Sequence, residues 1–128
     1  MNIKIIDISK EEIIKILNDY SEKSQELFDL INEFKYADSQ RRQEVKEVLK
    51  QKYKAIKDEV RELYKHLNKS SVKLEGYTAS ILEPAIRDIY VHISSVGTNL
   101  ISFNSIGKFT SAVYDIGDYA RYWLSHIK

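Results

Sequence analysis

Histidine and arginine recur at one spacing in this chain. Each of the three histidines lies five residues after an arginine, in the pairs Arg61/His66, Arg87/His92 and Arg121/His126. Histidine titrates near neutral pH and can move a proton, whereas the planar guanidinium of arginine binds phosphate through two parallel hydrogen bonds. These residue types are therefore suited to work on a phosphodiester without a metal ion.

The middle pair carries a further signal. The segment Arg87-Asp-Ile-Tyr-Val-His92 resembles the Arg-polar-x-x-x-His signature of HEPN-domain ribonucleases, which are small all-α dimers. The resemblance implies that Arg87 and His92 face their symmetry mates across a cleft. There the histidine would act on the 2′-hydroxyl chemistry and the arginine would hold the scissile phosphate. The tyrosine that often follows this histidine by two positions is Ser94 here. A metal-independent ribonuclease is thus one alternative function.

A row of cations marks one flank of the predicted second helix, at steps of four and three: Arg42, Lys46, Lys50, Lys54, Lys57, Arg61 and Lys65. Such a row can follow nucleic-acid phosphates, with Tyr53 and Tyr64 to stack on bases. The predicted first helix carries a row of carboxylates, which favours pairing between the two helices instead. Its members are Glu12, Asp19, Glu22, Glu26, Asp29 and Glu33. Nucleic-acid binding is therefore the second alternative.

The sequence does not predict a metal site. Two carboxylate pairs, Glu44/Glu47 and Glu59/Glu62, fall on one predicted helix, whereas Mg²⁺ is usually held where several helices converge. The histidines fall on three different predicted helices, and the chain has no cysteine. No Gly-rich phosphate loop or nucleophile elbow is present in the sequence. We therefore expect no metal and no cofactor, and a protein that is not an enzyme.

Residues 9–68 are predicted to form a charged helical hairpin. Ser9-Lys-Glu-Glu12 is a capping box that starts the first helix. Apolar residues then recur at steps of four and three over residues 13–34, with Ser24 as the one polar member of this seam. A second helix begins near Asp38 or Ser39, and the short connection makes the two helices neighbours.

The rest of the chain differs in composition. Residues 1–75 carry 31 of the 39 charged side chains, whereas residues 76–128 carry only eight and hold all four glycines. Residues 1–8 look extended, and residues 68–79 lack periodicity and predict a loop. Residues 80–127 predict a charge-poor pair of helices, which has too little polar surface to face water on all sides.

Proline and glycine place constraints on this charge-poor pair. Pro84 fits only the first turn of a helix, where its missing N–H matters least. Gly97-Thr-Asn99 separates the two helices. Gly107 and Gly117 fall inside the last helix, at a cost of about 1 kcal/mol each relative to alanine. A helix keeps such residues where another backbone comes close, or where it bends.

These elements predict one all-α domain over residues 1–128: a four-helix, mostly antiparallel bundle with a short extended N-terminal arm. No apolar run is long enough to span a bilayer, and residues 1–8 are too short and too charged for a signal peptide. The formal net charge is +1, so no overall field directs the chain to nucleic acid or membrane. We therefore expect a cytoplasmic protein without membrane contact.

Aromatic residues of the last helix predict a contact surface. Tyr114, Tyr119 and Tyr122 lie off its apolar seam, and Trp123 lies on the seam beside them. Tyrosine and tryptophan are enriched where proteins bind one another. The leading prediction is a small non-enzymatic helical protein that works by self-association or by binding a protein partner. Adaptors, inhibitors, immunity proteins and virion proteins all fit that description.

Overall fold

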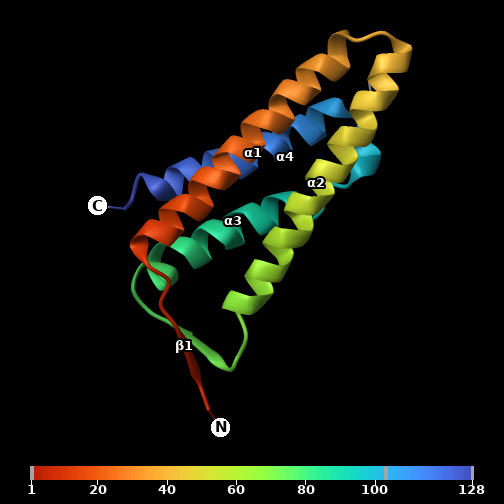
Figure 1. Ribbon diagram of the computed structural model, residues 1–128. Coiled ribbons are helices and arrows are strands. Elements are labelled where there is room, and N and C mark those ends of the chain that lie inside the picture. The colour runs from red at the N-terminus through yellow and green to blue at the C-terminus, as the bar shows by residue number, and fades with distance from the viewer. Residues whose placement is uncertain (1, 103, 128) are drawn as a thin grey trace.

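The protein is mostly helical, with 77% of its residues in helices. The computed structural model describes residues 2–102 and 104–127, so Met1 of the predicted N-terminal arm lies outside it. The prediction of four helices is confirmed (Figure 1). They are α1 (Lys10–Tyr36), α2 (Ser39–Leu67), α3 (Glu83–Ile93) and α4 (Ile106–Leu124).

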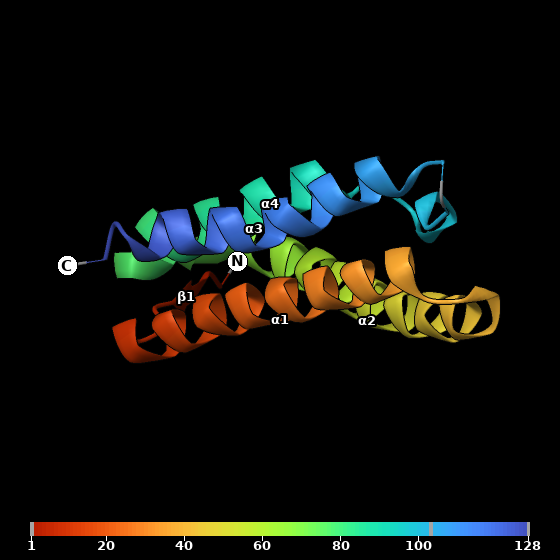
Figure 2. The ribbon, with the colours of Figure 1, turned by 90° about the horizontal axis from the view of Figure 1, so that it is seen from above.

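The four helices pack in two layers (Figure 2). One layer holds α1 and α2, and the other holds α3 and α4. Contacts join α1 to α2, α2 to α3, α3 to α4, and α4 back to α1, the last being the most extensive. Each helix therefore covers two others around a shared apolar core. That the arrangement is mostly antiparallel stays a prediction.

The two long helices begin as their sequences predict. The Ser9 side chain accepts a hydrogen bond of 3.2 Å from the Glu12 N–H and so caps α1. The Asp38 carboxylate accepts one of 2.8 Å from the Arg41 N–H and caps α2. Every member of the predicted α1 seam is buried, Ser24 included, because the heptad spacing turns these residues to one side of the helix.

Residues 68–79 differ from their prediction as a loop. They contain β2 (Val72–Leu74), which pairs in parallel with β1 (Lys4–Ile6) of the extended N-terminal arm. The partner of β2 is distant in sequence, so local periodicity could not reveal the pairing. Gly76 then turns the chain with a φ of 58°, which glycine adopts without strain.

The start of α3 also differs from a simple helix. A π-helical turn, η1 (Thr78–Leu82), runs directly into α3, and the Glu83 N–H bonds to the Thr78 carbonyl. Pro84 lies in the first turn of α3, as predicted. The buried Thr78 hydroxyl accepts a hydrogen bond of 2.7 Å from the Ile8 N–H, which ties the N-terminal arm to this turn. A short 3₁₀ turn, η2 (Thr98–Leu100), separates α3 from α4.

A glycine allows the close contact of α1 and α4. A Cβ atom added at Gly117 would lie 2.6 Å from the Ser24 Oγ, which is far too short. The Ser24 hydroxyl donates a hydrogen bond of 2.7 Å to the Val113 carbonyl of α4. Gly117 therefore marks a close approach to α1, although the nearest atoms belong to the side chains of Ser24 and Arg121 and not to another backbone as predicted. At Gly107 an added Cβ would meet nothing within 4 Å.

Two buried tyrosines hold their hydroxyl groups on defined partners. The Tyr20 hydroxyl donates to the Glu59 carboxylate of α2 at 2.8 Å, and the Tyr53 hydroxyl donates to the Val96 carbonyl at 2.8 Å. Burial raises the pKa of both phenols above the ordinary range, and the Glu59 charge raises that of Tyr20 further. Both hydroxyls therefore stay protonated and keep α2 attached to its neighbours.

The two glycines of α4 give a matched test of this packing. Gly117→Ala should lower the free energy of unfolding by about 1–3 kcal/mol, since the new methyl group overlaps Ser24. Gly107→Ala should leave it unchanged or raise it by up to about 1 kcal/mol through helix propensity. Denaturant unfolding measures both. Equal effects of the two substitutions would contradict the proposed contact of α1 with α4.

Candidate functional site

The predicted contact residues lie on and beside the outer side of α4. Tyr114 is 45% exposed and Tyr122 is 53% exposed, whereas Tyr119 and Trp123 are half-buried against the core. We use the name aromatic face for Tyr119, Tyr122 and Trp123 together with His92 of α3 and His126. None of the three α4 aromatic residues of this face belongs to the fully buried core.

Tyr114 lies apart from the aromatic face. Its ring packs on Phe28 of α1, with the ring centroids 4.8 Å apart. Tyr119, in contrast, contacts His92 of α3. Because five residues along a helix turn the side chain by about 140°, Tyr114 and Tyr119 lie toward opposite neighbours of α4. The four aromatic residues chosen from the sequence therefore cover two sides of one helix.

His92 is held by both of its ring nitrogens. Nδ1 lies 2.7 Å from the Asp88 carbonyl oxygen, and Nε2 lies 2.9 Å from the Tyr119 hydroxyl. A carbonyl only accepts, so Nδ1 carries a hydrogen and donates to Asp88, which leaves Nε2 as the ring nitrogen that faces the Tyr119 hydroxyl. Burial raises the pKa of the Tyr119 phenol, and nearby carboxylates, Asp115 first, add to the rise. The phenol is therefore a donor, not a nucleophile, at neutral pH.

Trp123 fixes the other end of the aromatic face. Its Nε1–H donates a hydrogen bond of 2.8 Å to the Asp88 carboxylate. The Tyr122 ring meets the Trp123 ring edge-on at 5.3 Å and lies 4.6 Å from the ring of His126. Burial also raises the pKa of the Asp115 carboxyl, which the charge of His92 opposes. Asp88 thus holds two rings of this face, one through its backbone and one through its side chain.

Arg87 does not join His92 in this structure. Its guanidinium lies 3.4 Å from the Glu83 carboxylate, one turn earlier on α3, and both Arg87 and His92 are exposed. The five-residue step turns the two side chains by about 140° from each other. The ribonuclease alternative therefore needs a second copy to complete any site, as the resemblance itself implies.

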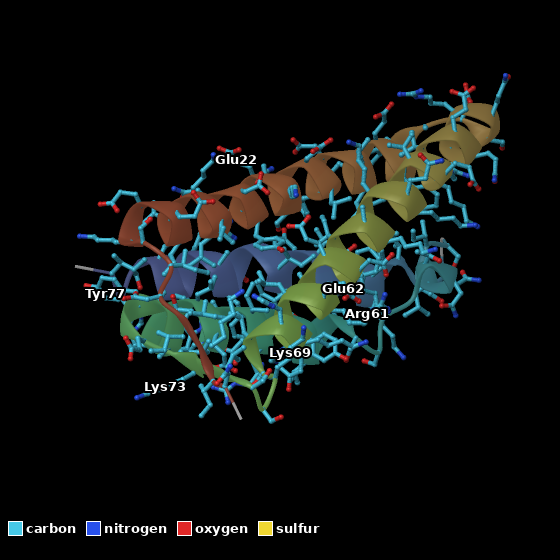
Figure 3. All side chains as sticks on the ribbon, turned by 60° about the horizontal axis from the view of Figure 1, so that its bottom comes forward. Glu22, Arg61, Glu62, Lys69, Lys73 and Tyr77 are labelled. Atoms are coloured by element: carbon cyan, nitrogen blue, oxygen red, sulfur yellow. The ribbon has the colours of Figure 1, made fainter. Side chains whose placement is uncertain are left out.

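The basic flank of α2 is engaged mostly by its own surroundings. Lys50 pairs with Glu47, and Arg61 pairs with Asp58 and Glu62. Figure 3 labels Arg61 and Glu62 on α2. The Lys57 ammonium donates to the Val96 carbonyl at 3.2 Å. The Arg42 guanidinium donates to the carbonyls of Phe34 and Ala37, at the link between α1 and α2. Lys46 is half-buried, and Lys54 and Lys65 are exposed.

Two carboxylates of the predicted α1 row do pair with α2, but with cations outside the basic flank: Glu33 pairs with Arg41 and Glu26 pairs with Lys52. A further ion pair joins Lys23 of α1 to Glu59 of α2. The rotation of α2 about its axis turns Arg41 and Lys52 toward α1, and sequence spacing does not fix that rotation. Tyr53 is buried and the Tyr64 ring stacks on Tyr90, so neither is placed to stack on a base.

Over residues 2–102 and 104–127, no three histidine, aspartate or glutamate side chains converge as a metal site. The two carboxylate pairs have other partners: Glu44 binds Arg41, Glu47 binds Lys50, Glu59 binds Tyr20, and Glu62 binds Arg61. No described helix is long and apolar enough to cross a membrane. The cytoplasmic location stays a prediction.

Comparisons of the chain with family models, curated proteins and solved structures give no match. The resemblance of residues 87–92 to HEPN-domain ribonucleases therefore depends on those six residues alone.

Sequence reasoning missed the two hydrogen bonds that join α3 to α4. Tyr119 and His92 are 27 residues apart in the chain, and Trp123 and Asp88 are 35 residues apart. A signal was present: Asp88 and His92 are four residues apart on α3, and Tyr119 and Trp123 are four residues apart on α4. Side chains at this spacing share one side of a helix. The pair Asp88 and His92 on α3 could therefore have been predicted to face the pair Tyr119 and Trp123 on α4.

Asp88→Ala should loosen the aromatic face. It leaves the Trp123 N–H without its partner and should lower the free energy of unfolding by about 1–2 kcal/mol. Because Trp123 is the one tryptophan of the chain, its near-ultraviolet circular dichroism should weaken as well. Asp118→Ala, which removes an exposed partner of Arg121, is the control and should change both quantities little. An unchanged tryptophan signal in Asp88→Ala would contradict the hydrogen bond.

Proposed function

We propose that this protein is non-enzymatic and works by self-association, with the aromatic face as its contact with a second copy. The proposal takes the four helices as a mostly antiparallel bundle, which the short link between α1 and α2 and the ring of helix contacts support. The half-exposed rings of Tyr119, Tyr122 and Trp123 are the observation on which it depends.

The contrast between the two layers supports this choice of surface. The α1–α2 layer meets water through ion pairs, whereas the outer side of α4 carries aromatic rings and few charges. Large rings that stay partly exposed are the residues on which binding energy concentrates. Tyr119 and Trp123 are already fixed by hydrogen bonds to α3, so little side-chain entropy is lost when a partner covers them.

A second copy is the partner that the charges of this surface favour. His92 of α3 lies close enough to Asp115 of α4 for its positive charge to lower the pKa of that carboxyl, and Asp118 lies one turn of α4 away from Asp115. A two-fold contact places the same patch on both partners, so a patch with both signs of charge can match itself. A patch of one sign would instead repel its own copy.

Tyr122→Ser tests the proposal. Tyr122 is more than half exposed, so its loss should leave the fold intact while it removes a central ring from the contact. We expect the dissociation constant of the dimer to rise by about 30-fold, which corresponds to a loss of about 2 kcal/mol. Sedimentation equilibrium measures it.

Tyr36→Ser is the matched control, because Tyr36 is 88% exposed at the far end of α1. It should leave the association unchanged. A wild-type protein that stays monomeric, or a Tyr122→Ser variant that associates like the wild type, would contradict the aromatic face as the contact.

A second candidate function is metal-independent RNA cleavage by the same dimer. One observation favours it: His92 lies on the aromatic face, so a dimer formed there brings two copies of His92 into one interface. In the free chain the Tyr119 hydroxyl occupies His92 Nε2, so a 2′-hydroxyl reaches that nitrogen only when Tyr119 turns away. As expected from the sequence, His92 would then act on the 2′-hydroxyl and Arg87 would hold the scissile phosphate.

Incubation with RNA in the presence of a chelator tests this candidate. Cleavage should be lost in His92→Gln, which keeps a polar side chain but cannot titrate near neutrality. His66→Gln, an exposed histidine on α2, is the control and should cleave like the wild type. An uncleaved RNA, or equal cleavage by both variants, would remove this candidate.

Nucleic-acid binding through the basic flank of α2 stays a weaker prediction. Arg42, Lys50, Lys57 and Arg61 already contact carbonyl or carboxylate groups of this chain. With Tyr53 and Tyr64 engaged, such binding would depend on phosphate neutralisation alone.

A further inference from the structure

A pocket lies between α2 and the η2 turn, with a volume of about 280 Å³. Gly97 and Thr98 line it from the turn, and side chains of α2 line it from the helix. Tyr53 belongs to the lining as well; it is fully buried, and its hydroxyl donates to the Val96 carbonyl just before the turn. Pockets for drug-sized ligands are usually larger, so this one suits a small molecule or a single ionic group.

Three cations line the α2 side of this pocket. Lys54, Lys57 and Arg61 follow one another at steps of three and four, which sets them on one side of the helix. Asp58 is the one carboxylate of the lining. The chain as a whole has a net charge of only +1. Positive charge is therefore concentrated at this pocket and favours an anion there.

Two of these cations are held in place and still have donors to spare. The Lys57 ammonium donates one N–H to the Val96 carbonyl at 3.2 Å. The Arg61 guanidinium lies 3.1 Å from the Asp58 carboxylate and 3.7 Å from the Glu62 carboxylate. An ammonium has three N–H donors and a guanidinium has five, so these contacts leave others available. The contacts position both cations beside the pocket without satisfying them fully.

Two further donors have no partner in the part of the chain that the structure describes. Lys54 precedes Asp58 by four residues, the spacing of a helical ion pair, yet Asp58 binds Arg61 instead. The Thr98 hydroxyl, on the other element, likewise has no hydrogen-bond partner. A free ammonium and a free hydroxyl thus line one small pocket from two elements.

We propose that this pocket binds the phosphate group of a small molecule. A phosphate monoester carries more negative charge than a carboxylate and has three strong acceptor oxygens. It can therefore accept from the ammonium groups, the guanidinium and the hydroxyl together, whereas the two oxygens of a carboxylate would leave part of this donor set unused.

A single phosphate group fits the surroundings better than a nucleic-acid backbone does. A backbone needs a row of free cations, but Lys50, the next cation of the basic flank before Lys54, already pairs with Glu47. The pocket gives a role to three residues of the flank without requiring the whole row. It contains no residue of the aromatic face, so the proposal does not depend on self-association.

Titration with inorganic phosphate tests the proposal, followed by the nuclear magnetic resonance shift of the Gly97 amide. Sodium chloride keeps the ionic strength constant, so general screening does not change. We expect a saturable, single-site shift with phosphate and a smaller one with acetate. Lys54→Gln should raise the dissociation constant for phosphate about tenfold, since it removes a charged hydrogen bond. Because Lys54 has no partner in the described chain, circular dichroism should be unchanged.

Lys65→Gln is the matched control. It removes the same charge from the same flank of α2, but Lys65 does not line the pocket, so the dissociation constant should change less than about twofold. Thr98→Val removes no charge and keeps the β-branched shape. It should still raise the dissociation constant about threefold, because the hydroxyl donor is lost. A general positive field would respond equally to both lysines and would not respond to Thr98.

Four results would overturn the proposal. They are a wild-type protein with no saturable phosphate shift, an equal response to acetate, equal effects of Lys54→Gln and Lys65→Gln, and a Thr98→Val variant that binds like the wild type. A competition arm separates the two sources of phosphate. If an RNA oligonucleotide without a terminal phosphate displaces inorganic phosphate from the pocket, the occupant is a nucleic-acid backbone and the small-molecule assignment is wrong.

Discussion

The close packing of α1 on α4 is the constraint on which the rest of the structure depends. Ser24 reaches the Val113 carbonyl because Gly117, one turn later on α4, has no side chain in the way. A hydrogen bond inside an apolar contact is directional, so it fixes the rotation of α4 as well as its distance from α1. Phe109, Val113 and Ile116 are then turned into the core.

The same rotation decides which residues remain outside. With Val113 and Ile116 inward, Tyr122 is left exposed, and Tyr119 and Trp123 lie against α3. Asp88 then accepts a hydrogen bond from each side of the aromatic face: its backbone carbonyl accepts from His92 and its carboxylate accepts from Trp123. The aromatic face is therefore a consequence of how α4 meets α1. This is why the proposed contact surface and the stability of the core depend on one helix orientation.

Structural features that depend on residues of a single helix could be predicted from the sequence. The caps at Ser9 and Asp38 need only residues three positions away, and the seam of α1 follows from helical periodicity. A close approach or a bend was expected at both Gly107 and Gly117, but the sequence did not choose between the two glycines or name Ser24 as the neighbour. These predictions succeed because the helix itself fixes the geometry between the residues concerned.

Contacts between distant elements could not be predicted in the same way. The pairing of β2 with β1 needs a partner that is far away in sequence, and Val-Lys-Leu alone does not specify one. The pairing of Lys52 with Glu26, in place of the cations of the basic flank, depends on how α2 is rotated against α1. The hydrogen bond from Tyr119 to His92 likewise needs both helix orientations at once. Sequence spacing defines the faces of each helix but not which face meets which neighbour.

Hydroxyl-radical footprinting over a range of protein concentrations tests the central claim most directly, since it reports the exposure of each aromatic ring in solution. If the aromatic face is covered by a second copy, oxidation of Tyr122 should fall as the concentration rises, while oxidation of Tyr36 stays constant. A Tyr122 ring that is oxidised equally at every concentration would contradict the account.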